Sequence, residues 1–286
     1  MKIFSYLSIL LASAGMFLSG CTGKSSGSEA FPADTVSFKT VNLADSVSLS
    51  DDVNDISKIR AKVNISVPKH YSDTAAFAGF RKTFLKFLFG TDTVHGDSEK
   101  LAVRYLKSFF ANFKSSDTLK IQGPDIKSEE EMPEEDVSGL VDAELNVYNV
   151  YNRNGIVSLC MEKVQQFENQ EKSTEHYYLN YNLNRKEVID VATLFGSDNY
   201  EDLCNLLRRK LLEQNSADSE EDLINSGYFN LDNLSATDNF KIAENGIIWC
   251  YQPLEIGCYS LGETEIFVSF DELHEYAAND STTLLN

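Results

Sequence analysis

The densest group of side chains that could carry acid–base chemistry lies between Ser128 and Asp136, where six carboxylates surround Met132 and Pro133. A carboxylate pair can act as general acid and base only when a fixed geometry and an apolar setting separate the two pKa values. A run of like charges next to proline is instead typical of a solvated loop. We therefore interpret this segment as a loop.

No other catalytic signature stands in a suitable context. His-Glu-x-x-His, which marks zinc proteases, is absent from the sequence. The one match to the Gly-x-Ser-x-Gly pattern of serine hydrolases, Gly23 to Gly27, lies in the Gly/Ser-rich segment directly after Cys21 and not between a strand and a helix. His274 and Glu275 follow Asp271 and Glu272 on a short predicted helix, where they are more simply surface charges. The sequence thus predicts a protein that is not an enzyme and assigns it no catalytic residue. The alternative is an envelope hydrolase or deacetylase acting on peptidoglycan.

The residue with the clearest chemical fate is Cys21. A positively charged n-region precedes an apolar run, which ends in the lipobox-like Leu18-Ser19-Gly20-Cys21. A run this short that ends in small residues is a secretory signal and not a membrane span. We expect residues 1–20 to be a lipoprotein signal peptide and Cys21 to carry the lipid. The exported chain would then be anchored in the cell envelope, at the outer membrane or facing the periplasm. An ordinary signal peptide with an incidental cysteine is the alternative.

The remaining cysteines and the histidines form no metal-binding pattern. None of their spacings resembles a zinc site, so the sequence predicts no metal and no cofactor. Apolar neighbours suit buried free thiols, although an exported protein can form disulfides. For Cys250 and Cys258 we favour free thiols, with Cys250 directed into an apolar layer, and a disulfide stays open. The full set is Cys160, Cys204, Cys250, Cys258, His70, His95, His176 and His274.

The chain is strongly acidic. Its formal net charge is −19 and becomes −20 when Lys2 leaves with the signal peptide. Such a surface repels nucleic acid, whose binding depends on cation release from phosphates, and it favours cationic partners. Acidity that serves only solubility is an equally simple interpretation. No later apolar run approaches the roughly 20 residues that span a bilayer, which excludes a transmembrane receptor.

The hydrophobic pattern divides the first half of the mature chain into a polar tether, a strand and two helices. Residues 21–55 are Gly/Ser-rich and then aperiodic, which is typical of a flexible tether. An alternating strand runs from Ile59 to Val67 and ends at Pro68. Two helices with phenylalanine-rich stripes follow, and Gly90 fits the C-cap of the first. Both helices are predicted to serve the core.

The rest of the chain mixes hairpins with helices. Asn154-Gly155 predicts a hairpin over 140–167, and further strands are expected over 177–183, around 244–246 and over 264–270. Three Asp/Ser-x-x-Glu pairs, at Asp198, Asp218 and Ser269, predict capped helices. Without βαβ regularity, the predicted fold class is α+β. It would comprise mostly antiparallel sheets with packed helices in two closely associated subdomains, 56–175 and 176–286.

Short motifs in the C-terminal half occur in an order that resembles a known family. They are Tyr181-Asn182-Leu183, Val188-Ile189-Asp190-Val191, Asn245-Gly246-Ile247, Pro253-Leu254-Glu255 and Val268-Ser269-Phe270. The order, over about Tyr177 to Tyr276, resembles the domain of unknown function 3298 family. That family occurs in the ectodomain of lysozyme-responsive anti-sigma factors (RsiV-like) and beside the catalytic domain of peptidoglycan deacetylases. Residues 58–90 and the Asn-Gly hairpin are similar to its usual partner, the domain of unknown function 4163.

The resemblance implies a non-catalytic binding module. Its partner would be a cationic protein of lysozyme type or a cell-wall glycan, and a scaffold subunit of an envelope complex is a further alternative. The ligand-binding candidates lie on and beside an ordered loop: Pro253, Glu255, Tyr259, Trp249 and Tyr251. The competing interpretation places Trp249 and Tyr259 in the core. The family often carries a Gly-Gly-Ala-His segment before the Tyr-Asn strand, whereas residues 168–172 of this chain read Glu-Asn-Gln-Glu-Lys. Whatever role that segment has in the family therefore does not carry over to these residues.

The lipobox makes a direct prediction. The mature chain should begin at a diacylated or triacylated Cys21 and partition into the detergent phase. Cys21→Ala should be released from the membrane or remain uncleaved. An unmodified Cys21 in the mass spectrum of the mature wild-type chain would end the lipoprotein interpretation.

Overall fold

The computed structural model describes residues 34–48, 58–90, 100, 102–108, 140–167 and 171–278. The signal peptide, Cys21 and the carboxylate run at 128–136 lie outside these residues. Within the described ranges, no helix is long and apolar enough to cross a membrane.

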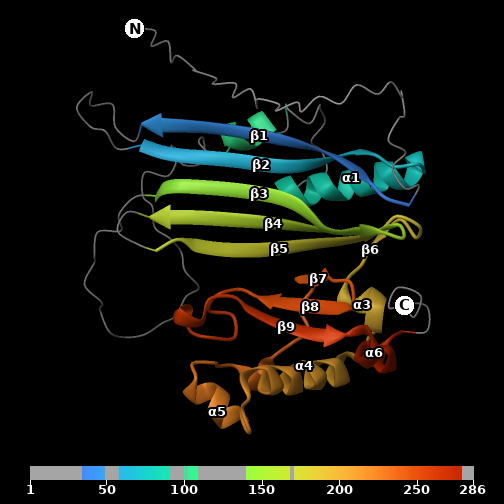
Figure 1. Cartoon of the computed structure of the whole chain (residues 1–286), viewed down its shortest axis with the longest axis vertical. Helices are drawn as coiled ribbons and strands as arrows, with labels where there is room; N and C mark the ends of the chain where they lie inside the picture. The colour runs from blue at the N-terminus through green and yellow to red at the C-terminus, as the bar shows by residue number, and fades with distance from the viewer. Residues whose placement is uncertain are drawn as a thin grey trace, which may run out of the picture.

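A six-stranded sheet forms the larger part of the molecule (Figure 1). Its strands follow the chain in order, and only β2 and β3 pair in parallel. A chain that folds into two sheets with packed helices confirms the α+β class. The strands are β1 (Ser37–Ser48), β2 (Lys58–His70), β3 (Leu140–Arg153), β4 (Ile156–Phe167), β5 (Ser173–Asn182) and β6 (Glu187–Val188).

One face of this sheet carries the first hydrophobic core. The alternating residues of β2, from Ile59 to Val67, are buried there, and the strand continues past Pro68. Helix α1 (Thr74–Phe89) covers the face with Phe80 and Phe84. The helix begins where Asp73 accepts hydrogen bonds from two backbone amides and ends at Gly90, whose φ of 69° needs no Cβ. Residues 102–108 form another helical segment on this core.

The Asn-Gly hairpin is confirmed. Asn154 and Gly155, with φ of 57° and 74°, connect β3 and β4. Positive φ at both central residues matches the right-handed twist of the paired strands, which is why Asn-Gly is favoured here.

The predicted tether is wrong over part of its length, because Ser37–Ser48 is strand β1, paired along β2. Phe38, Val41 and Leu43 of this strand pack on the first core, but Phe38 is out of phase with the other two in a period of two. Val41 is buried, whereas most of the strand is exposed or half-buried. That pattern is too weak to be read as alternation.

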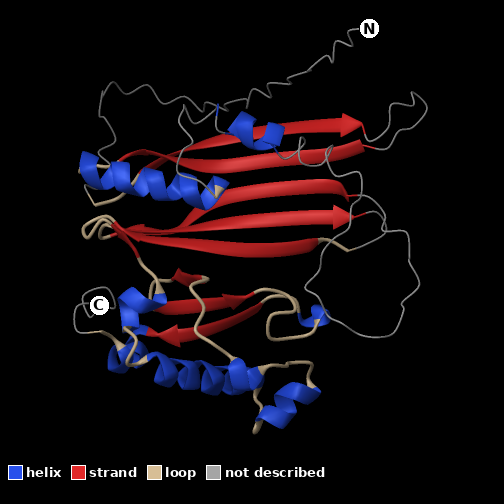
Figure 2. Ribbon diagram, turned by 180° about the vertical axis from the view of Figure 1, so that it is seen from behind, coloured by secondary structure: helices blue, strands red, loops and turns tan. Residues whose placement is uncertain are grey.

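A smaller antiparallel sheet and the remaining helices form the C-terminal part. The sheet has the order β7 (Phe240–Ile242), β8 (Gly246–Tyr251) and β9 (Thr264–Ser269). It lies between the β5 side of the large sheet and helix α4 (Figures 1 and 2). The other elements are α3 (Val191–Phe195), α4 (Tyr200–Asn215), α5 (Glu220–Asn225), η1 (Leu231–Asn233), η2 (Tyr259–Leu261), α6 (Phe270–Leu273) and η3 (His274–Tyr276).

Two of the three predicted helix caps need correction. The Ser269/Glu272 capping box is present at α6. Helix α4 begins instead at Asn199 without a side-chain cap bond. At α5 the reciprocal pair is Ser219 with Asp222, one residue later than predicted. Neighbouring acidic residues offered several equivalent registers, and the backbone selected one of them.

The predicted subdomain boundary at 175/176 also moves. Strand β5 pairs with β4 over ten residues and therefore belongs to the large sheet. The second core begins at Ile189 and Val191 and continues to Leu273, with Ile156 and Tyr151 of the hairpin packed against it. The change of core thus follows β6.

The two parts meet in a polar seam centred on Asn239. Its Oδ1 accepts from the backbone amide of Tyr178 at 3.0 Å, and its Nδ2 donates to the carbonyls of His176 and Cys250, each at 2.9 Å. The buried Asn180 donates to the Phe240 carbonyl at 2.7 Å. The Asn239 amide thus satisfies two backbone groups of β5 where β6 does not reach it, and the Asn180 amide satisfies one of β7.

Candidate functional site

Two of the five predicted binding residues belong to the core. Trp249 and Tyr251 are 0% and 1% exposed, and Trp249 packs between Phe195 and Phe240. The Tyr251 hydroxyl donates to the Ser235 carbonyl at 3.0 Å. As contact residues these two were predicted wrongly, because β8 is covered on both faces.

The other three lie on the loop that leaves β8. The amide of Gln252 donates to Glu255 Oε2 at 2.8 Å, and the Glu255 amide returns a bond to the Gln252 carbonyl at 3.0 Å. Glu255 is exposed but closes this turn, and Pro253 is half-buried within it. Leu254 at the tip has a φ of 70°, a conformation that side chains with a Cβ rarely adopt.

The far end of the loop is fixed to the segment after α5. Cys258 donates its amide to the Gly227 carbonyl at 2.8 Å, and Phe229 donates to Ile256 at 3.0 Å. Gly227 has a φ of 102°, and a Cβ there would lie 2.7 Å from Cys258 Sγ. The close approach therefore needs glycine, and it ties the loop to α5.

This end of the molecule presents large apolar side chains to solvent. We call Ile224, Leu254, Tyr259 and Leu261 the loop surface. Ile224 lies on α5, and Tyr259 and Leu261 lie on η2. These two elements are at the same end of the small sheet (Figures 1 and 2). Such exposure is typical of contact sites when residues gather. Their exposed fractions are 57% for Ile224, 49% for Leu254, 54% for Tyr259 and 37% for Leu261. Of the sequence candidates, Tyr259 is the one whose exposure suits a contact.

The charge around the loop surface is one-sided. From Leu211 to the end of the sequence the only Lys or Arg is Lys241, and its ammonium pairs with Glu265. Asp218, Glu220 and Glu221 at α5 are exposed. The cations that precede this stretch lie on α4, where Arg209 and Lys210 are paired with Glu213. The exposed carboxylates of α5 therefore add a negative field beside the apolar side chains.

The prediction that Cys250 and Cys258 are free thiols is confirmed. Cys160, Cys204, Cys250 and Cys258 are all free. The direction of Cys250 needs correction: it points away from Trp249 into the polar seam, 3.8 Å from Glu265 Oε1, and not into an apolar layer.

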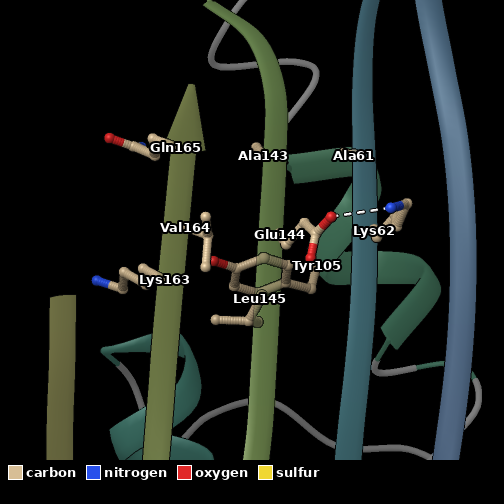
Figure 3. A pocket seen from close by; sticks show the side chains of 9 residues that line it. All are labelled: Ala61, Lys62, Tyr105, Ala143, Glu144, Leu145, Lys163, Val164 and Gln165. Carbon is tan, nitrogen blue, oxygen red and sulfur yellow. Dashed lines mark hydrogen bonds and ion pairs between the residues drawn. The ribbon is translucent and has the colours of Figure 1, made fainter. Parts of the chain in front are cut away.

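A small cavity lies on the large sheet, over β2, β3 and β4 (Figure 3). Its volume is about 40 Å³, which holds a few water molecules and no sugar ring. Lys62 and Glu144 form an ion pair of 2.8 Å beside it. The lining residues are Ala61, Lys62, Tyr105, Ala143, Glu144, Leu145, Lys163, Val164 and Gln165.

The sequence after β6 matches a known family model. Residues 192–271 match the family model described as protein of unknown function, DUF3298. This stretch contains a DUF3298 domain. It begins where the second core begins and ends in α6, and it lies within the longer span expected from the motifs. No curated protein matches the chain.

Solved structures extend the likeness over both parts of the chain. A DUF3298 family member from Bacteroides fragilis aligns with a TM-score of 0.70 and 14% identity, over 87% of this chain and 96% of that one. A DUF3298 family protein from Pseudomonas aeruginosa aligns with a TM-score of 0.54 and 13% identity, over 87% and 98%. At these identities the likeness shows a shared fold. The predicted partner domain in the N-terminal half stays a prediction.

The strained tip of the loop makes a prediction about stability. A left-handed conformation costs a residue with a Cβ roughly 1–2 kcal/mol, and asparagine tolerates it better than leucine. Leu254→Asn should therefore raise the free energy of unfolding by about 1 kcal/mol in urea titrations. Leu261→Asn is the control, because Leu261 is exposed but has no positive φ. If the free energy of unfolding of Leu254→Asn is equal to or lower than that of Leu261→Asn, the backbone at Leu254 is not strained.

Proposed function

We propose that the chain is a membrane-anchored lipoprotein of the cell envelope that acts as a non-catalytic binding module for a cationic protein of lysozyme type. The observation that carries the proposal is the loop surface, where exposed apolar side chains lie at the same end of the molecule as the exposed carboxylates of α5. The lipid on Cys21 and the export of the chain rest on the lipobox, and the type of partner on the family resemblance.

Each component of the loop surface has a distinct part in binding. Tyr259 and Leu254 supply the apolar area that dominates the energy of most protein contacts. Their backbones are fixed by the Gln252–Glu255 turn and the bonds to Gly227, so little ordering is needed when a partner docks. The carboxylates of α5 attract a cationic partner over long range and accelerate encounter.

A cell-wall glycan is the second candidate partner. A neutral or acidic glycan gains nothing from the negative field at α5, so the charge favours the protein partner. The dependence of binding on salt distinguishes the two.

The test measures lysozyme binding to the full chain, captured in detergent, at increasing salt. The on-rate should fall more than tenfold between 0.1 and 1 M salt, as the Debye length shortens from about 10 Å to about 3 Å. Tyr259→Ala should weaken binding at least tenfold. Phe267→Ala is the matched control, because this aromatic ring is also exposed but lies on β9.

Three outcomes would contradict the proposal. Equal losses for Tyr259→Ala and Phe267→Ala would remove the loop surface from the contact. Salt-independent binding of glycan fragments, without lysozyme binding, would assign the glycan instead. Hydrolysis or deacetylation of peptidoglycan by the purified chain, abolished by one side-chain change, would make it an enzyme.

A further inference from the structure

Three ligating side chains converge where the small sheet faces β5. Cys250 on β8 and Glu265 on β9 are direct cross-strand partners, and Glu263 lies just before β9. A sulfur from the first and one carboxylate oxygen from each of the others lie within 4.8 Å of one another. The linear spacing of these residues matches no metal motif, so only the pairing of β8 with β9 reveals the set.

The two carboxylates are held from outside the set. His176 on β5 bonds Glu263 Oε2 through Nδ1, and Lys241 on β7 bonds Glu265 Oε1. The His176 ring also has Glu162 at 3.4 Å from Nε2. Histidine and charged donors in such positions are typical outer partners that orient the ligands of a metal ion.

One oxygen of Glu263 points to a missing ligand. The side chain is 14% exposed, and its Oε1 is shielded from solvent without a hydrogen-bond partner among the described residues. A buried carboxylate oxygen without a partner carries the full cost of its desolvation. A cation beside Oε1 would remove that cost.

The geometry points to a zinc site: we propose that Cys250, Glu263 and Glu265 bind one Zn²⁺ ion, with solvent as the fourth ligand. Thiolate with carboxylates is a donor set that zinc accepts in tetrahedral geometry, whereas magnesium and calcium require oxygen alone. Zn²⁺ and the Lys241 ammonium together match the charge of one thiolate and two carboxylates, and the His176–Glu162 contact lies outside this count.

Binding displaces one proton. Burial raises the pKa of the Cys250 thiol, so the metal-free thiol is protonated. Zinc takes the sulfur as thiolate, and the proton leaves to solvent. The ion would fasten the β8–β9 hairpin beside β5, close to the Asn239 seam. This inference goes beyond the proposed binding function and does not depend on it.

Cobalt is the direct probe, because a Co²⁺–thiolate bond gives a near-ultraviolet charge-transfer band. The full chain, reduced and stripped with a chelator, should bind one equivalent of Co²⁺ with this band, and Zn²⁺ should abolish it. Cys250→Ser should lose the band. Cys258→Ser should retain it, since Cys258 lies on the neighbouring loop outside the set.

A second variant keeps the thiol in place. Glu263→Gln should weaken zinc binding at least tenfold in competition with a chromophoric chelator, and Zn²⁺ but not Mg²⁺ should raise the melting temperature of the wild-type chain. Absence of the band in the wild type, its persistence in Cys250→Ser, or unchanged zinc affinity in Glu263→Gln would each overturn the site.

Discussion

The arrangement of the whole molecule depends on how the open edge of β5 is satisfied. Strand β6 pairs with only the last two residues of β5, so the amide and carbonyl groups before them need other partners. The Asn239 side chain bonds the Tyr178 amide and the His176 carbonyl of β5 and at the same time the Cys250 carbonyl of β8. The Gln252 side chain also donates to the His176 carbonyl, and the Ile189 amide donates to the Asn180 carbonyl. At about 1 kcal/mol net for each bond, the three bonds of Asn239 contribute about 3 kcal/mol. The Asn239 side chain also ends the large sheet, which would otherwise present an edge for further pairing.

The features that face solvent at the C-terminal end follow from this seam. With β7 and β8 joined to β5 through Asn239, Trp249 packs in the second core and the Cys250 thiol lies beside Tyr178 of β5. The loop after β8 then leaves the core, closes through Glu255, and is fastened at Gly227. Leu254 and Tyr259 are therefore exposed on a rigid frame, and the carboxylates of α5 lie at the same end. The shared fold of the two DUF3298 family structures extends over both sheets.

Local signals in the sequence predicted the local elements. Asn154-Gly155 has the turn chemistry of its hairpin, α1 ends at Gly90, and Ser269 caps α6, because each depends on a few neighbouring residues. Features that depend on distant pairing were missed. Asn239 has no pattern around it, and Glu263 meets His176 only after both sheets have formed. Strand β1 was missed for a local reason, because its alternation is too weak to be recognised. The direction of Cys250 was predicted from alternation alone, which could not show that the facing layer is polar.

Residue-resolved hydrogen exchange at the Tyr178 amide tests most directly whether Asn239 joins the two sheets, because this amide donates to Asn239 Oδ1. In Asn239→Ala this amide should exchange at least tenfold faster than in the wild-type chain. Amides within the β3–β4 hairpin, such as that of Leu159, should keep their protection because their ladder does not involve Asn239. An unchanged exchange rate at Tyr178 would contradict the claim that Asn239 joins the two sheets.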